Sequence, residues 1–424
     1  MKDILKAIIP GKDEIKKIRK IADKIIKEIN KEGYEAMLVG SAARGTFVSG
    51  ENDIDIFVFF PEKTTREELE KKGVKLGKKI LKKHKPTTHY AEHPYVRAKV
   101  NGFYVEIVPC YNYKNNEKLK SSVDRTPLHN KYVIDKITDK EREQIILLKK
   151  FLKANKLYGA DQKVKGFSGY LCELLIINYK SFENLIKEAA NNWNKRIEID
   201  LENQRKDYSK FKNPLVVIDP VDKERNVAAA VSKTTLSRFV LKAREYEKTK
   251  NTKMFKVKKE RINLKQKIKG RKIITISFKA PEIIPEILWS QLEKLTKNIK
   301  EKLYENEFDI YKTGYWTDEK KKCGIILELK QYELPIYKKN KGPEIWDKQN
   351  TEKFIEKNND CWVHRSTIYC WKKRKYTQAI KLIEEYLTKS NSIPSYLKKT
   401  VKKPKIRKGD KTTKEKELLK FYFN

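Results

Sequence analysis

The stretch VGSAARGTFVSGENDIDIFVFF, residues 39–60, decides the fold of the N-terminal part of the chain. It places Ser41 directly after a glycine and, one short loop later, two aspartates, Asp53 and Asp55, separated by a single isoleucine. Side chains alternate along a strand, so both carboxylates lie on one face while the isoleucines point into the core. Carboxylates held in this way repel each other unless a cation lies between them. Mg²⁺, which favours oxygen ligands and substrate phosphates, is the expected ion.

The segments around this stretch predict a small mixed α/β unit. Apolar residues recur at helical spacing from Ile15 to Ile29 and predict a helix. YEAMLVG predicts a buried strand, IDIFVFFP a second strand ended by proline, and residues 65–83 an amphipathic helix. Asn101 and Gly102 separate YVRAKV from FYVEIVP, which predicts a hairpin with a two-residue turn.

A third carboxylate and a fixed positive charge complete the candidate site. Transfer of phosphoryl or nucleotidyl groups by two metal ions needs a third carboxylate, and Glu106, on the strand after the hairpin, is the candidate. The Gly-Ser turn can offer backbone N–H groups to phosphates, and Arg44 adds a positive charge. The alternative for the two aspartates alone is a solvated acidic strand face. The pattern is shared by polymerases, antibiotic-modifying enzymes and oligoadenylate synthases.

The composition indicates a polyanionic partner. The 424 residues include 97 Lys+Arg against 57 Asp+Glu, a formal net charge of +40. A Lys-rich genome or a high-temperature habitat is the alternative explanation, but that trend raises Glu as well and leaves the balance nearer neutral. Nucleic acid is therefore the favoured partner.

The cysteines and the hydropathy predict a soluble, cytoplasmic protein. The five cysteines include no C-x-x-C pair, which suits neither a disulfide framework nor a zinc site and implies a reducing compartment. Cys361, His364 and Cys370 lack zinc spacing and are interpreted as structural. No apolar run is long enough to span a bilayer, and the N-terminus has no signal-peptide pattern, so no membrane association is expected.

The pattern along the chain predicts an α+β, multidomain protein with three parts. Residues 1–135 form the mixed unit, residues 136–250 are mostly helical, and residues 251–424 are α+β. Residues 248–272, with twelve basic side chains and one acidic, are interpreted as a linker or exposed connector. Residues 398–420, with eleven basic and three acidic side chains, are interpreted as a solvated helix or a basic tail.

Eight motifs, in this order, resemble the archaeal, class I CCA-adding tRNA nucleotidyltransferases of the polymerase β-like superfamily: GSAARG, NDIDIF, YAEHPYV, YVEIVPCY, VDRTPLHNKYV, LLKKFLKAN, YGADQKVKGFSGYLCELL and DPVDKERNVAAAVS. The resemblance covers nearly the whole chain and is densest between residues 38 and 232. The bacterial and eukaryotic class carries a Gly-Gly-x-x-Arg-Asp turn and a later Arg-Arg-Asp, which are not found here.

The resemblance implies template-independent addition of C, C and A to the 3′ end of tRNA from CTP and ATP, with release of pyrophosphate. It also implies Mg²⁺, a polymerase β-like nucleotidyltransferase head, a helical neck, and a body and tail that bind the acceptor and T arms of tRNA through shape and phosphates.

The resemblance assigns roles to individual residues. The metal-binding carboxylates fall on Asp53, Asp55 and Glu106, the triphosphate contacts on Ser41, Arg44, Lys149 and Tyr158, and the base-reading arginine on Arg225. Two departures stand out: the third carboxylate is commonly Asp where this chain has Glu106, and a phosphate-contacting His often stands where it has Asn130. His129, the neighbour of Asn130, is a candidate to compensate. The structural alternatives are a solvated helix residue for Lys149, packing for Tyr158, a hydrogen-bonding loop residue for His93, and an ion pair with Asp219 or Asp222 for Arg225.

Two other functions compete with this one. A poly(A) polymerase or oligoadenylate synthase uses the same three acids. An RNA-binding protein with an inactive transferase head is the non-enzymatic alternative, although it would have no reason to keep all three carboxylates. The sequence leaves the oligomeric state open, with a homodimer as one alternative.

Overall fold

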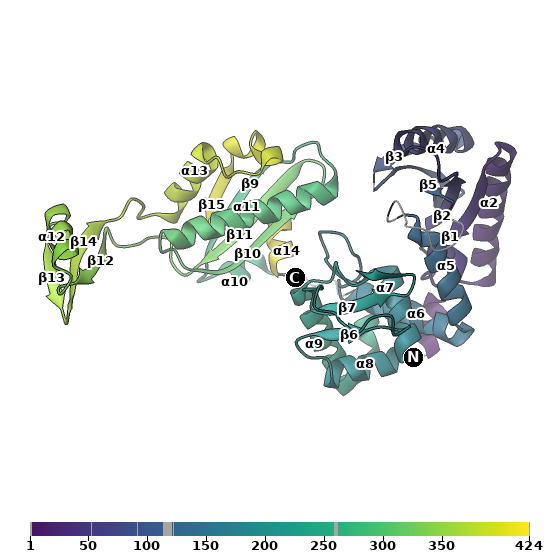
Figure 1. Ribbon diagram of the computed structural model, residues 1–424, viewed down its shortest axis with the longest axis horizontal. Coiled ribbons are helices and arrows are strands. Elements are labelled where there is room, and N and C mark those ends of the chain that lie inside the picture. Colours follow the sequence, from purple (N-terminus) through teal and green to yellow (C-terminus); the bar gives the residue numbers. More distant parts are fainter. Residues whose placement is uncertain are drawn as a thin grey trace. The chain divides into compact units, whose positions relative to one another are not determined.

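The protein divides into two compact units, Met1–Lys259 and Glu260–Asn424. The computed structural model describes residues 2–51, 53–90, 92–112, 121, 123–257 and 262–423. Both units mix helices and strands (Figure 1), which confirms the expected α+β, multidomain class. No helix in the described ranges combines the length and the apolar character needed to cross a bilayer.

The N-terminal part of the first unit contains a five-stranded mixed sheet with strand order β1-β2-β5-β4-β3. Strands β2 and β5 run parallel, and the other neighbours run antiparallel. Helices α2 and α4 share one core with the sheet, in which Ile18 and Leu69 join Ile54 and Ile56 of β2. The bounds are α1 Lys2–Ile8, α2 Lys12–Lys31, β1 Glu35–Val39, α3 Gly40–Arg44, β2 Asp53–Phe60, α4 Arg66–Ile80, β3 Thr87–Tyr90, β4 Pro94–Val100 and β5 Phe103–Tyr111, with a 3-10 turn at Lys82–His84.

Local signals explain these elements. Helix α4 begins with a capping box, in which Thr65 and Glu68 each bond the other's backbone N–H. Asn101 and Gly102 have φ values of 50° and 92°, the two positive angles that a tight two-residue hairpin turn needs, and they join β4 to β5 as predicted.

Helices α5 to α9 and a small sheet with order β6-β7-β8 complete the first unit. Their core contains a cluster of aromatic rings that includes Phe151, Phe182, Tyr246 and Phe255. The bounds are α5 Arg125–Lys136, α6 Asp139–Ala154, α7 Gly169–Tyr179, α8 Phe182–Asn191, β6 Ile197–Ile199, β7 Leu215–Asp219, β8 Asp222–Asn226 and α9 Lys233–Thr249, followed by a 3-10 helix at Thr252–Phe255.

The segment interpreted as a basic connector is partly core. Met254 and Phe255 are only 3% and 1% exposed and pack among the aromatic rings. Two large apolar side chains are enough to anchor a stretch whose composition is otherwise basic, because lysine heads stay in water while the apolar groups are buried. Residues 258–261, in the middle of the expected connector, lie outside the described residues.

The second unit contains an antiparallel sheet with order β10-β11-β9-β15, covered on one face by α11 and α13 and on the other by α10 and α14. It also contains a three-stranded sheet with order β12-β14-β13 that carries α12 (Figure 1). The bounds are α10 Leu264–Ile268, β9 Lys272–Lys279, α11 Pro285–Glu305, β10 Ile310–Thr317, β11 Lys322–Leu329, β12 Tyr337–Glu344, α12 Lys348–Lys357, β13 Cys361–His364, β14 Thr367–Lys373, α13 Ala379–Lys389, β15 Lys405–Lys408 and α14 Lys416–Phe423, with 3-10 turns at Ser395–Leu397, Thr400–Lys402 and Gly409–Lys414.

The lysine-rich segment 398–420 is an integral part of this second unit, so its interpretation as a solvated helix or basic tail was wrong. Strand β15 pairs with β9, and Leu418 and Leu419 of α14 are buried against the sheet. The apolar residues between the lysines provide the anchoring that a count of charges does not reveal.

Candidate active site

Three carboxylates lie side by side on the parallel strands β2 and β5. Asp55 is directly opposite Glu106 in the strand register, and Asp53 lies two residues before Asp55 on the same face. Ile54 and Ile56 are fully buried on the other face, as the alternation in the sequence predicts. The expected proximity of Glu106 to the aspartate pair is therefore present.

The charges of these carboxylates are poorly compensated by the protein. Burial, together with the charge of Asp53, raises the pKa of Asp55 to about 6. Burial, together with the charge of Asp55, raises the pKa of Glu106 to about 7. Carboxyl groups that resist ionisation in this way are stabilised by an added cation, and oxygen donors suit a hard divalent ion.

Arg97, on β4, lies between two of the carboxylates. Its Nη2 donates to Asp53 Oδ1 at 2.9 Å, its Nε lies 3.4 Å from Glu106 Oε1, and its guanidinium stacks on the ring of Tyr104 at 4.3 Å. Over the residues that the structure describes, no three His, Cys, Asp or Glu side chains converge closely enough to enclose a metal ion. The donor chemistry thus fits a divalent cation, while the arginine partly takes the place of that positive charge.

Gly40 explains why a Gly-Ser turn stands beside the carboxylates. Its φ of +74° lies in the left-handed region, and a Cβ atom at this position would lie 2.3 Å from Asp55 Oδ2. Any other residue at position 40 would therefore strain the backbone and would also clash with the Asp55 carboxylate. The turn brings α3, which begins with Gly40 and Ser41, directly against the acidic face.

The other end of α3 enters a buried charge network, which we call the Arg44 cluster: Arg44, Thr46, Asn130, Lys149 and Glu173. Arg44 Nε lies 3.0 Å from Glu173 Oε2, and its Nη1 donates to Asn130 Oδ1 at 3.3 Å. Lys149 Nζ donates to Glu173 Oε1 at 3.2 Å and to the Thr46 carbonyl at 3.0 Å. Burial opposes ionisation of Glu173, but the charges of Arg44 and Lys149 outweigh it and lower the pKa of this carboxyl.

Lys149 and Tyr158 converge at the start of α7. Lys149 is 1% exposed, so the alternative that it is a solvated helix lysine was wrong. A Cβ atom on Gly169, the first residue of α7, would lie 3.1 Å from Tyr158 Oη and 3.6 Å from Lys149 Nζ. The Nζ of Lys153 lies 4.4 Å from the centre of the Tyr158 ring. The structure thus gathers Arg44, Lys149 and Tyr158 around one helix.

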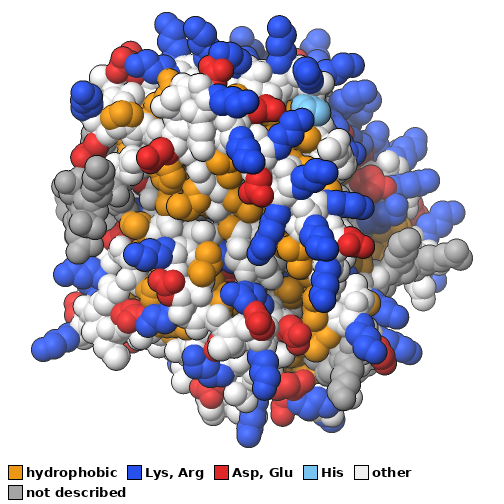
Figure 2. All heavy atoms as spheres, turned by 90° about the vertical axis from the view of Figure 1, so that its right-hand side faces the viewer, with side chains coloured by type: hydrophobic (Ala, Val, Ile, Leu, Met, Phe, Trp, Pro, Cys, Tyr) orange, Lys and Arg blue, Asp and Glu red, His pale blue; other side chains and the backbone are white. Residues whose placement is uncertain are grey.

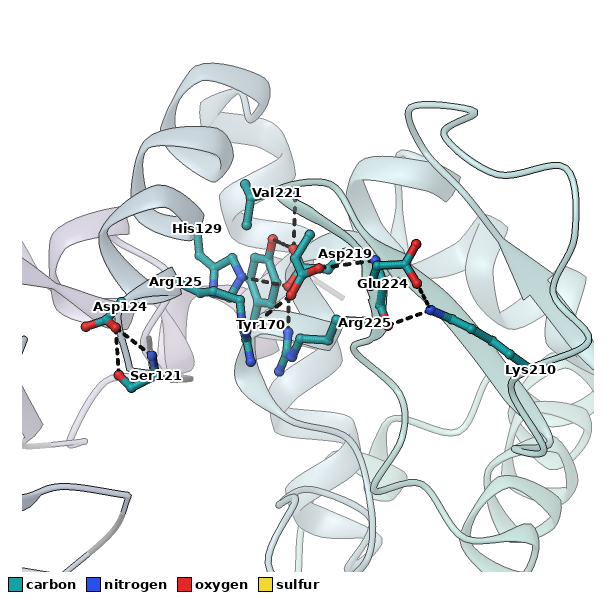
Figure 3. Close-up of polar contacts among 11 residues, drawn as sticks. Ser121, Asp124, Arg125, His129, Tyr170, Lys210, Asp219, Val221, Glu224 and Arg225 are labelled. Carbon is teal, nitrogen blue, oxygen red and sulfur yellow. Dashed lines mark hydrogen bonds and ion pairs between the residues drawn. The ribbon is translucent and has the colours of Figure 1, made fainter. Parts of the chain in front are cut away.

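Arg225 belongs to a second buried network, which we call the Asp219 cluster: His129, Tyr170, Asp219 and Arg225 (Figure 3). Arg225 Nη1 donates to Asp219 Oδ2 at 2.6 Å, so the ion pair considered as its structural alternative is present. His129 Nε2 lies 2.8 Å from the same oxygen. The Arg225 side chain remains 35% exposed, so the ion pair leaves part of it open to solvent.

Other residues singled out in the sequence have structural partners. His93 is 2% exposed, and its Nδ1 lies 3.5 Å from Glu70 Oε1. Cys361 and Cys370 face each other across β13 and β14 as free thiols.

Sequence reasoning missed the role of Glu173. This residue is the one acid in the apolar helix GYLCELLIINY, and a charged residue is rarely buried without a partner. That contrast was the available signal. Arg97 and Tyr170 carried no comparable signal, since an arginine on a strand and a tyrosine on a helix are ordinary.

Comparison with known proteins matches this architecture along the chain. Residues 15–129 match the nucleotidyltransferase domain, residues 143–256 the second domain of tRNA nucleotidyltransferase, and residues 269–409 the C-terminal domain of CCA-adding enzyme. Among solved structures, the similarity to the RNA terminal uridylyl transferase Cid1 covers 60% of this chain and 96% of that protein, at 14% identity and a TM-score of 0.47.

Archaeal relatives match almost end to end. The CCA-adding enzyme of Methanocaldococcus jannaschii is 37% identical over 94% of this chain and 93% of its own. The CCA-adding enzyme of Methanothermobacter thermautotrophicus is 34% identical over 92% and 88%. With the three domain matches in order, the chain belongs to the CCA-adding enzymes, a family of tRNA nucleotidyltransferases.

Proposed function

We propose that this chain adds C, C and A to the 3′ end of tRNA from CTP and ATP in a single site around α3, with release of pyrophosphate. The observation that carries the proposal is the position of this short helix. Its first residue, Gly40, lies so close to the Asp55 carboxylate that a Cβ atom there would clash with it, and its last, Arg44, belongs to the buried Arg44 cluster. A metal-binding face and a phosphate-binding group therefore adjoin, which is the arrangement that nucleotidyl transfer from a triphosphate needs.

The nucleotidyltransferase fold generally uses divalent metal ions, and we infer Mg²⁺ here. Asp53, Asp55 and Glu106 would hold it, because they are oxygen donors on one face of neighbouring strands. When bound, the ion favours loss of the proton from the terminal 3′-hydroxyl and offsets the charge of the triphosphate. The longer Glu106 side chain reaches the same face from the position opposite Asp55.

The Arg44 cluster would hold the triphosphate. Arg44 and Lys149 supply fixed positive charge, Tyr158 supplies a hydroxyl, and Ser41 lies at the start of α3. Asn130, in the place where relatives often have His, bonds Arg44 and would act by orienting this guanidinium. Arg225 would read the base, since its side chain is partly exposed and its donors can match the edge of cytosine or adenine.

The tRNA would be bound largely by residues 251–424, through its acceptor and T arms. The net charge of +40 supports a polyanionic partner. Figure 2, which faces the side of the first unit that carries α2 and α4, shows lysine and arginine side chains scattered over that face without marking one patch. In the second unit, Trp346 and Trp371 are 77% and 53% exposed, and Lys339 Nζ lies 3.8 Å from the centre of the Tyr369 ring. Exposed aromatic rings beside lysines suit contact with bases and phosphates of RNA.

The division into a catalytic head (1–135), a helical neck (136–250) and a tRNA-binding part (251–424) belongs to this proposal, and so does a cytoplasmic location. The five cysteines are free thiols, which supports a reducing compartment. A homodimer stays one alternative for the oligomeric state, and light scattering tests whether one forms.

The test is incubation with tRNA that lacks its CCA end, using labelled CTP and ATP separately and together. The proposed function predicts two C additions with CTP alone and completion by A when both are present. Long tracts made from ATP alone would instead indicate a poly(A) polymerase or oligoadenylate synthase. Binding of tRNA without any incorporation would indicate an RNA-binding protein with an inactive head.

A further inference from the structure

Asp219 is fully buried at the end of β7, and both of its carboxylate oxygens are saturated with donors (Figure 3). Oδ1 accepts from the Val221 backbone N–H at 3.2 Å and from the Tyr170 hydroxyl at 3.2 Å. Oδ2 accepts from Arg225 Nη1 at 2.6 Å and from His129 Nε2 at 2.8 Å. A carboxylate has about four lone-pair sites, so these partners leave none for a ligand.

In the Asp219 cluster, Asp219 and Arg225 are the charged side chains, and His129 is neutral. Burial alone would raise the pKa of Asp219, but the hydrogen bonds from His129 and Arg225 outweigh burial and lower it. Burial also lowers the pKa of His129. The ring is therefore neutral near pH 7, and since the ionised carboxylate only accepts, the His129 proton lies on Nε2.

The backbone around Asp219 directs Arg225. The register between β7 and β8 is irregular at Asp219. In the turn that joins the two strands, the Val221 backbone N–H donates to Asp219 Oδ1. Asp222, on the other side of the turn, is held by Arg125 of α5 at 3.2 Å. Arg225 lies three residues after Asp222 on β8. The contacts of Asp219 and Asp222 therefore fix both ends of the turn that precedes this arginine.

The two buried clusters share the same two helices. On α5, His129 contacts Asp219, and the next residue, Asn130, contacts Arg44. On α7, Tyr170 belongs to the Asp219 cluster, and Glu173, one turn later, belongs to the Arg44 cluster. The distance between the arginine proposed for the base and the arginine proposed for the triphosphate is thus set by two helices and not by loops.

We propose that Asp219 is the positioning residue that fixes Arg225 toward the base of the incoming nucleotide and so determines nucleotide specificity. The inference rests on the proposed base-reading role of Arg225. Asp219 occupies one terminal nitrogen of the guanidinium, and the 35% exposed side chain keeps other donors for the base edge. An arginine tethered at one nitrogen presents its planar donors in one orientation, which favours one base pattern over another. Asp219 itself is saturated and buried, so it acts only through Arg225.

The experiment measures kcat/KM for CTP, ATP, UTP and GTP on truncated tRNA with Arg225→Ala, Asp219→Asn and the double variant. Asp219→Asn should lower discrimination against UTP and GTP by roughly 10- to 100-fold, like Arg225→Ala, because lost base contacts of this kind cost about 1–3 kcal/mol. The double variant should discriminate no worse than Arg225→Ala, since non-additivity is the sign that one residue acts through the other. The loss should appear mainly in KM for nucleotide, with tRNA affinity retained.

Two further variants keep the test decisive. Tyr170→Phe removes one donor to Asp219 and keeps the ring that stacks on His129 at a centroid distance of 3.9 Å, so it should give a smaller loss in the same direction even if Asp219→Asn does not fold. Glu224→Gln, the matched control, removes an acid next to Arg225 that is 62% exposed and pairs with Lys210. It should discriminate like the wild type.

Each outcome is distinguishable. If Arg225→Ala discriminates like the wild type, the base-reading function fails, and the positioning role of Asp219 fails with it. If Arg225→Ala loses discrimination while Asp219→Asn and Tyr170→Phe keep it, base reading stands and the positioning role is overturned. Additive losses of stability with unchanged discrimination would make Asp219 a residue of the fold alone.

Discussion

The chain holds two kinds of buried carboxylate, and they differ in how their negative charge is met. At Asp55 and Glu106, burial and neighbouring acids raise the pKa to about 6 and about 7. At Glu173 and Asp219, burial is outweighed by cationic and hydrogen-bonding partners, and the pKa of each carboxyl is lowered. The first pair is in an unfavourable electrostatic state, and the second pair is in a favourable one.

This difference separates two kinds of role. Carboxylates whose charge the protein compensates only in part are stabilised further by a bound cation, which suits a metal site. Carboxylates that the protein compensates fully have no capacity for a ligand, and their contribution is to hold other groups in place. The comparison therefore predicts opposite consequences when an acid is neutralised in each set.

The largest effect is expected from Asp53→Asn or Asp55→Asn. Each keeps the shape of the side chain and removes its charge, so CCA addition should fall by about 10⁴-fold, the range found for groups that act as a unit in catalysis. The affinity for tRNA, measured by filter binding, should be nearly unchanged because the acidic face does not hold RNA phosphates. Near wild-type incorporation by both variants would contradict the metal-site assignment.

The next largest effect is expected at Glu173, one of the two carboxylates whose charge the protein compensates. Glu173→Gln leaves Arg44 and Lys149 buried without their counter-charge, which should lower the free energy of unfolding by about 3–5 kcal/mol. Urea denaturation measures this loss, with the exposed pair variant Glu224→Gln as the control. KM should rise in equal proportion for CTP and ATP, because the cluster is assigned to the triphosphate that both share. Unequal changes for the two nucleotides would contradict that assignment.

Neutralising Asp55 should raise stability, whereas neutralising Glu173 should lower it. The pKa of Asp55 is raised from its ordinary value of 3.8 to about 6, so the folded carboxyl binds its proton more readily than the unfolded one, and wild-type stability falls as the pH rises through about 6. Asn does not titrate. In the absence of metal, Asp55→Asn should therefore be more stable than the wild type at pH 8 by up to about 3 kcal/mol, at 1.36 kcal/mol per pKa unit.

Thermal unfolding in a chelating buffer at pH 4 and pH 8 checks this result. The difference between Asp55→Asn and the wild type should be small at pH 4, and adding a divalent cation at pH 8 should shrink it. A wild type that is the more stable protein at pH 8 without metal would contradict the view that this face is electrostatically strained.

The smallest effect per residue is expected where charges are exposed. Replacing Lys398, Lys399, Lys402 and Lys403 by Gln removes four exposed lysines from the basic segment of the second unit. The slope of log affinity for tRNA against log salt should flatten by nearly one unit for each lost phosphate contact. Anisotropy titrations of several tRNAs measure it, and all should weaken alike because phosphates carry no sequence. Unchanged affinity and slope would remove this segment from the tRNA interface.

Some of the site was predictable because it depends on neighbours along the chain. The alternation of Asp53, Ile54 and Asp55 and the turn at Asn101 follow from backbone geometry over a few residues. Lys149 was not predictable, because a lysine in a helix is usually solvated, and its burial depends on Glu173 from another helix. The anchoring of residues 398–420 was likewise hidden by their lysines.

The sequence by itself determined the acidic strand face, the Gly-Ser turn, the basic balance and, through its motifs, the family. Each depends on residue types in order or on contacts within a few residues. Only the tertiary structure decided that Glu106 lies opposite Asp55, that Glu173 compensates Arg44 and Lys149, and that His129 meets Asp219 from 90 positions away. The physical reason is that the energy of a charge depends on its burial and its partners, and both are set by segments that meet only when the chain folds.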